Sequence, residues 1–146
     1  PLDTGISNYF QRFQHDQGFS YRMDWIGART RQIADSMALW KRAVDLPILD
    51  VRYETLVADF EAQARRIVDF AGLEWRSTCL EPSRTRRAVL TASQWQVRQP
   101  VHRGSVGRWR RYEAWLGPMI EAMGGFDWIE QEVADASGEG RQPLEQ

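Results

Sequence analysis

Hydrophobic residues recur along much of the chain at steps of three and four, the period of a helix that packs one face on a core. This period predicts helices over residues 24–44, 61–70 and 106–123. The longest of them has as its apolar stripe Trp25, Ile26, Ile33, Met37, Trp40 and Val44. A shorter helix is expected near the start of the chain, where Asp3 or Thr4 could cap it.

One segment has a different pattern. Residues 48–53, with the sequence ILDVRY, form a short segment with β-branched residues that follows Pro47, a pattern that favours a strand.

The segment after residue 125 is acidic and becomes rich in glycine, serine and proline. This composition predicts an acidic, flexible tail over residues 126–146. The chain is therefore expected to be mostly helical, with one clear strand at about residues 48–53.

Composition places the chain among ordinary globular domains. It has 146 residues, of which 42% are apolar and seven are tryptophan, enough to bury a core in one domain. No apolar run approaches the about 20 residues of a membrane span, and no secretory signal is present, so a cytoplasmic protein is expected. The single cysteine, Cys79, excludes an internal disulfide, and with two histidines it argues against a zinc site.

Charge changes this picture in one place. Residues 82–112 contain eight arginines and no acid, although the net charge of the chain is only −1. The planar fork of arginine suits phosphate and sulfate. Gly104 and Gly107 would let backbone N–H groups approach an anion at the start of the following helix. The alternative is a solvated basic face without a ligand.

The basic block also carries residues at a characteristic spacing, namely Ser93, Gln96, Val97, Pro100, Gly104, Arg108 and Trp109. This pattern resembles the cofactor-binding segment of sulfotransferases that use 3'-phosphoadenosine 5'-phosphosulfate. It is most similar to the bacterial group associated with tetratricopeptide repeats, and more distantly to the tyrosylprotein sulfotransferases.

Two further segments extend the resemblance. The first seven residues, PLDTGIS, resemble the family element Arg-x-Pro-x-Asp-x-x-x-Ser, with Ser7 at the position of its serine. The arginine of that element would precede Pro1, so we expect the chain to be the C-terminal part of a longer enzyme. Residues 53–56 match the family's Tyr-Glu-x-Leu, in which the tyrosine lies against the adenine.

The resemblance implies an α/β fold, with residues 1–125 as the mostly helical C-terminal portion of a P-loop-like parallel-sheet domain. It implies sulfuryl transfer to a hydroxyl of a small molecule, a sugar or a peptide tyrosine, without a metal. The cofactor-binding residues that it implies are Ser7, Tyr53, Thr91, Ser93, Arg103, Gly104 and Arg108. No phosphate-binding loop of the form G-x-x-x-x-G-K-[ST] occurs. We therefore expect no catalytic residue among these 146 residues. The loop that binds the 5'-phosphosulfate and the catalytic base are expected to lie outside them.

Two other classes of function remain open. Arginines interleaved with Trp95, Trp109 and Tyr112 could bind nucleic acid by phosphate contacts and base stacking. The slightly acidic net charge and the acidic tail argue against this class. A helical module whose arginines pair with the acids of a partner protein is the other alternative.

Overall fold

The structure is a computed structural model that describes residues 1–11, 13, 17–81 and 103–137. The chain divides into two compact units. Unit 1 consists of Pro1–Ile48 and Gly107–Gln146, and unit 2 of Leu49–Val106. Within the described ranges every regular element is a helix, and no strand occurs.

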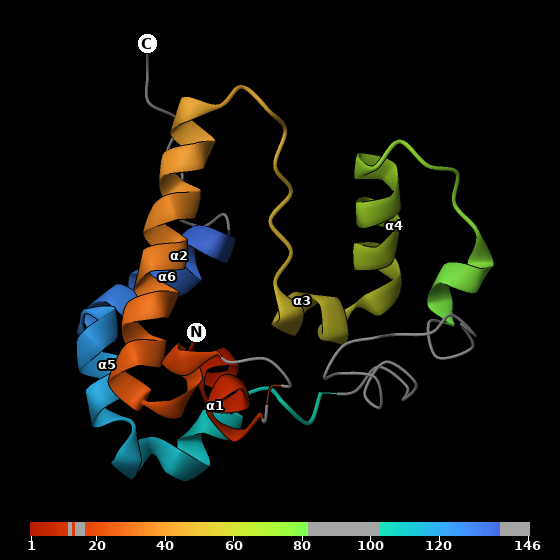
Figure 1. The fold of residues 1–146 in the computed structure, drawn as a ribbon. Helices are drawn as coiled ribbons and strands as arrows, with labels where there is room; N and C mark the ends of the chain where they lie inside the picture. The colour runs from red at the N-terminus through yellow and green to blue at the C-terminus, as the bar shows by residue number, and fades with distance from the viewer. Residues whose placement is uncertain (12, 14–16, 82–102, 138–146) are drawn as a thin grey trace. The chain divides into compact units, whose positions relative to one another are not determined.

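Unit 1 is built from helices at the two ends of the chain (Figure 1). Its α-helices and its 3-10 helices, labelled η, are α1 (Leu2–Phe10), η1 (Gly18–Tyr21), α2 (Met23–Ala43), η5 (Arg108–Trp115), α5 (Gly117–Met123) and α6 (Gly125–Ser137). A helix near the start of the chain was expected and is found as α1, and α2 begins and ends within one residue of its expected bounds.

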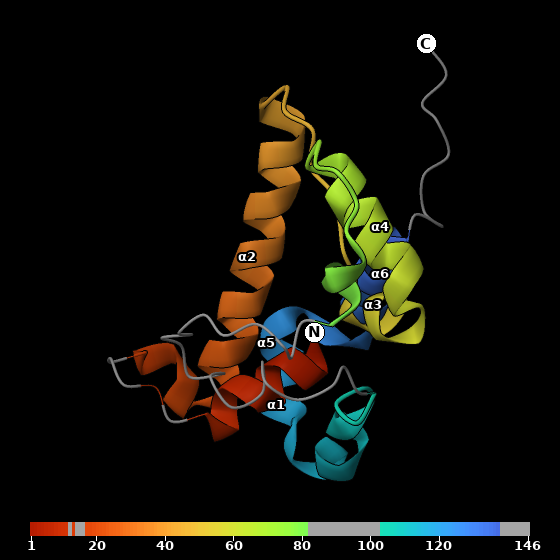
Figure 2. The ribbon, with the colours of Figure 1, turned by 90° about the vertical axis from the view of Figure 1, so that its right-hand side faces the viewer.

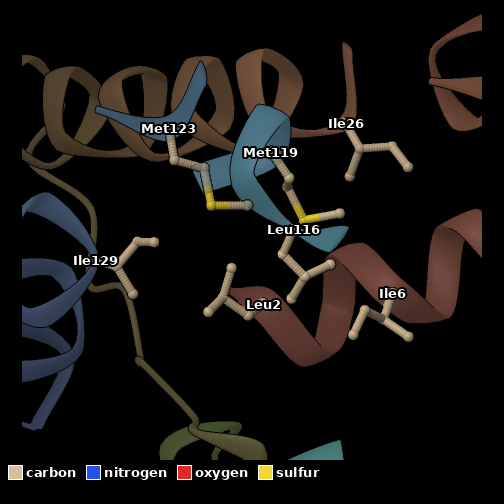
Figure 3. Close-up of a cluster of buried hydrophobic side chains, with 7 residues drawn as sticks. All are labelled: Leu2, Ile6, Ile26, Leu116, Met119, Met123 and Ile129. Carbon is tan, nitrogen blue, oxygen red and sulfur yellow. The ribbon is translucent and has the colours of Figure 1, made fainter. Parts of the chain in front are cut away.

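A single hydrophobic cluster holds unit 1 together. Figure 3 shows side chains from four helices and the η5–α5 junction pointing into it, namely Leu2, Ile6, Ile26, Leu116, Met119, Met123 and Ile129. Leu116, Met119 and Met123 are fully buried. Each buried side chain of this size stabilises the fold by about 1.5–3 kcal/mol. The cluster therefore joins the first residues of the chain to residues more than a hundred positions later.

Close contact between α2 and α5 depends on a glycine. A Cβ atom at Gly27 would lie 2.3 Å from the Met119 carbonyl oxygen and 2.9 Å from the Ala122 Cβ. The two helix backbones can approach this closely only because Gly27 has no side chain. Arg31, one turn further along α2, donates from Nη1 to the Met123 carbonyl at 3.2 Å and so caps the C-terminus of α5.

Unit 2 contains α3 (Tyr53–Ala58), α4 (Phe60–Phe70) and η2 (Ser77–Leu80). Asp59 separates α3 from α4 and caps α4, because its carboxylate accepts from the Ala62 N–H at 3.2 Å. The helix predicted over residues 61–70 is thus confirmed, and Gly72 follows it with a φ of +66°. The Arg65 guanidinium lies 4.2 Å from the centre of the Trp75 ring.

The predicted strand at residues 48–53 is wrong. Residues 48–52 form no regular element, and Tyr53 is the first residue of α3. Arg52 has an extended backbone, with φ −83° and ψ 133°, but an extended segment becomes a strand only when a neighbour completes its hydrogen bonds. Among the described residues no such neighbour exists, so the expected α/β fold with its parallel sheet is replaced by a helical one.

Two expected helices also differ in detail. The helix predicted over residues 106–123 is divided at Leu116 into η5 and α5. Pro118 explains the division, since proline has no N–H to donate and its ring clashes with the carbonyl four residues earlier. The apolar stripe of α2 is only partly in the core. Ile26 is buried, whereas Trp40 and the other predicted stripe residues are exposed on a helix that extends away from α1 and α5 (Figure 2).

The acidic segment expected as a tail begins with a helix. Residues 125–137 form α6, and Ile129 is buried in the cluster of unit 1. The remainder of the expected tail, residues 138–146, lies outside the described residues. None of the described helices is long and apolar enough to cross a membrane.

The α2–α5 contact generates a stability prediction. Gly27→Ala should lower the free energy of unfolding by about 1–3 kcal/mol, because the new methyl group would overlap the Met119 carbonyl and force the two helices apart. Gly117→Ala is the matched control, since no atom lies within 4 Å of a Cβ there. Urea unfolding followed by circular dichroism measures both. Equal unfolding free energies for the two variants would show that the α2–α5 contact is not tight.

Candidate functional site

The start of η5 is anchored by an acid from the other end of the chain. The Asp3 carboxylate accepts from the Gly107 N–H through Oδ2 and from the Trp109 N–H through Oδ1, both at 2.7 Å. These N–H groups stand at the N-terminus of η5, where helix donors have no partner within the helix. Gly107 has a φ of +71°, a left-handed conformation that favours glycine.

Sequence reasoning did not find this role of Asp3. Asp3 or Thr4 was predicted to cap the first helix, but α1 begins at Leu2 after Pro1 and no side chain caps it. Asp3 caps η5 instead, 104 and 106 positions away from its partners. No sequence pattern around Asp3 indicates a partner so far along the chain.

Arg108 lies between the two anchored residues. Its guanidinium carbon is 5.6 Å from the centre of the Phe10 ring in α1, and the Phe10 ring in turn lies 5.2 Å from the Tyr112 ring. Arg108 is exposed, and among the described residues its side chain makes no hydrogen bond or ion pair. Its charge is therefore available to an anion.

Ser7 lies on the same side of α1 as the two residues that contact η5. Asp3, Ser7 and Phe10 are spaced by four and three residues, which places them on one helix face. Asp3 bonds to η5 and Phe10 lies beneath Arg108. Ser7, between them along α1 and exposed, therefore belongs to the face of α1 that meets the start of η5.

The other predicted site residues lie elsewhere. Tyr53 is the exposed first residue of α3, and Arg103 and Gly104 also belong to unit 2. Gly104 does not have a positive φ, in contrast to Gly107. Thr91 and Ser93 lie outside the described residues.

Arg103 has a structural partner that the sequence did not predict. Its Nε donates to the Val57 carbonyl at 3.1 Å and its Nη2 to the Ala58 carbonyl at 2.7 Å. These carbonyls end α3, so Arg103 caps that helix with two of its three nitrogens and places positive charge at the negative end of the helix dipole.

An open groove of about 680 Å³ lies elsewhere in unit 1. Its lining residues come from α1, from η1 and the first residues of α2, and from α5, namely Tyr9, Tyr21, Arg22, Met23, Asp24, Pro118, Glu121 and Ala122. Arg22 donates to both carboxylate oxygens of Asp24, at 3.0 and 2.6 Å. This pairing, chiefly its hydrogen bonds, lowers the pKa of Asp24 below its ordinary value.

In the part of the chain that the structure describes, no three His, Cys, Asp or Glu side chains lie together as metal ligands. At the α1–η5 junction the structure brings together the Asp3 carboxylate, whose two oxygens accept from backbone N–H groups, and the Arg108 guanidinium, which lies over the Phe10 ring. Ser7 lies on the same face of α1 as Asp3 and Phe10.

Comparison with known proteins points to one family. The family model described as "Sulfotransferase family" matches residues 1–77 of the chain. A protein of Aquifex aeolicus (strain VF5), described as uncharacterized, is 37% identical over 125 residues. The match covers 84% of the present chain and 16% of that relative. No solved structure matches.

The α3 cap generates a prediction about local stability. Arg103→Ala should make the amides of Leu56 and Asp59, which close the turns of α3, exchange about two- to tenfold faster, because two carbonyl bonds at the helix end are lost. Arg76→Ala is the matched control, since Arg76 lies in the same unit, is exposed and has no such partner. Hydrogen exchange followed by NMR measures the rates. Unchanged α3 rates in Arg103→Ala would contradict the capping role.

Proposed function

The chain belongs to the sulfotransferase family, and on this premise we propose that it forms the nucleotide-binding part of an enzyme that uses 3'-phosphoadenosine 5'-phosphosulfate. The enzyme transfers the sulfuryl group to an acceptor hydroxyl of a small molecule, a sugar or a peptide tyrosine. The observation that carries the proposal is the α1–η5 junction, where an available arginine lies against the helix face that bears Ser7.

The chemistry of the 3'-phosphate fits this junction. A phosphate dianion is held against water by two or three charge-assisted hydrogen bonds, and arginine can supply two of them from its fork. The Arg108 guanidinium rests on the Phe10 ring, which leaves its edge free to donate. Ser7 supplies a hydroxyl donor from the same side of α1.

Gly107 was expected to let backbone N–H groups bind the anion, but these groups have another partner. The N–H groups of Gly107 and Trp109 are both bonded to Asp3 and are not available to an anion. Side chains therefore hold the phosphate in this proposal, and the glycine at position 107 shapes the turn that presents Arg108.

The remaining assignments rest on the family motifs. The proposal places Tyr53 against the adenine and Thr91, Ser93, Arg103 and Gly104 near the 3'-phosphate. Within unit 2, two of the three Arg103 nitrogens bond to carbonyls at the end of α3. Sulfuryl transfer itself needs cations on the bridging oxygen and a base for the acceptor, by analogy with phosphoryl transfer. The proposal assigns these groups to residues outside the 146, because no phosphate-binding loop motif occurs among them.

Removal of Arg108 tests the 3'-phosphate assignment. In the full-length protein, Arg108→Ala should weaken adenosine 3',5'-bisphosphate by about 1.5–3 kcal/mol, the range for a hydrogen bond to a charged group. Adenosine 5'-phosphate, which lacks the 3'-phosphate, should bind the variant and the wild type equally. Isothermal titration calorimetry measures both ligands.

Arg111→Ala is the matched control for charge, because Arg111 is an exposed arginine of the same helix. It should leave both affinities within a few tenths of a kcal/mol of wild type. If Arg108→Ala weakens the two nucleotides equally, Arg108 does not contact the 3'-phosphate.

The isolated 146 residues should transfer no sulfate to a phenol, a sugar or a tyrosine peptide. The reason is the assignment of the 5'-phosphosulfate loop and the base to other residues. A radiolabelled donor assay with the purified segment measures the transfer, and the full-length protein is the positive control. Turnover by the segment above the blank would contradict this assignment.

A further inference from the structure

We propose that Asp3 is a positioning residue for Arg108, an inference that rests on the proposed function. The carboxylate bonds to the N–H groups immediately before and after the Arg108 peptide unit, at 2.7 Å each. Two bonds from one rigid group fix the orientation of the chain at that residue. The direction in which the Arg108 side chain leaves the backbone is therefore set from α1.

The same helix supports the far end of the side chain. The Phe10 ring lies beneath the Arg108 guanidinium, and Asp3 and Phe10 are separated by two turns of α1. Arg108 is thus held at its backbone by Asp3 and at its head by Phe10, with Ser7 on the helix between them. An arginine carries about 2 kcal/mol of rotamer entropy, and this arrangement reduces the loss on binding a ligand.

The two oxygens of Asp3 also neutralise a competing site. The Gly107 and Trp109 N–H groups at the start of η5 would otherwise attract an anion. Because Asp3 occupies them, an incoming phosphate meets the guanidinium of Arg108 and not the backbone.

The direction in which neutralising Asp3 changes the affinity for the nucleotide distinguishes a positioning role from a purely electrostatic one. A carboxylate close to a phosphate repels it, so neutralising Asp3 should strengthen nucleotide binding if charge alone acted. Positioning predicts the opposite result. Asp3→Asn leaves one oxygen acceptor for two N–H groups, and the start of η5 loses one of its anchors.

The test uses the full-length protein and two ligands, adenosine 3',5'-bisphosphate and adenosine 5'-phosphate. Asp3→Asn should weaken the bisphosphate about three- to tenfold, the effect of one lost hydrogen bond, and leave the 5'-phosphate unchanged. In an Arg108→Ala background, Asp3→Asn should have no further effect on the bisphosphate, because Asp3 acts through Arg108. Asp35→Asn is the matched control, since Asp35 is an exposed acid of unit 1 paired with Arg31.

A ligand-free readout accompanies the titrations. In Asp3→Asn, the amide signals of Gly107 and Trp109 should move upfield, and the heteronuclear NOE of the Arg108 Nε–H should fall as the side chain becomes more mobile. Asp35→Asn should change neither of these signals.

Tighter bisphosphate binding by Asp3→Asn, additive losses in the double variant, or an unchanged Arg108 NOE would each overturn the positioning role while leaving the proposed function intact. A wild-type protein that binds the two nucleotides equally would overturn the proposed function, and the role of Asp3 with it. Equal weakening of both ligands by Asp3→Asn would show a general loss of structure and would also overturn the positioning role.

Discussion

The architecture of unit 1 depends on the hydrogen bonds that the Gly107 and Trp109 N–H groups donate to Asp3. They join α1 to η5 across more than a hundred residues, and closing a loop of that length costs entropy that local contacts do not return. The cost is offset on the adjoining face of α1, where Leu2 and Ile6 enter the core beside Leu116 and Met119. The hydrogen bonds to Asp3 and the apolar core therefore hold α1 on two of its faces.

The described arginines of the basic block have separate roles. Arg103 ends α3 through two carbonyls, Arg108 rests on Phe10, and Arg110 lies 5.1 Å from the centre of the Trp109 ring. The three arginines have different partners although they are close in sequence. A continuous phosphate-tracking face of the kind used for nucleic acid would need them aligned, whereas a single anion needs only one of them held in place.

The proposed function asks little covalent chemistry of the protein. Transfer of a sulfuryl group depends on fixed donors around a negative ligand more than on covalent chemistry by the protein. At the α1–η5 junction, α1 supplies a ring beneath the Arg108 guanidinium through Phe10 and an anchor for the backbone through Asp3, and it carries Ser7 on the same face.

The sequence alone determined much of the helical structure and the family. The three-to-four period predicted α2 and α4 almost to the residue, because helix period and capping depend on neighbours within a few positions. The spacing of residues in the basic block, extended by motifs at residues 1–7 and 53–56, indicated the sulfotransferases. The family match covers residues 1–77, which include the two shorter motifs and not the basic block. Ser7 and Arg108 were selected from motifs, and their assignment to the 3'-phosphate remains a prediction.

Only the tertiary structure decided what those elements do. Residues 48–52 have the composition of a strand but no strand beside them among the described residues, so they form no regular element. The burial of Ile129 in α6 depends on packing against residues from the first part of the chain. The partner of Asp3 lies 104 positions away, and no local pattern specifies it. A helical period can be read from neighbouring residues in the sequence. A long-range hydrogen bond forms only when the folded chain brings its donor and acceptor together.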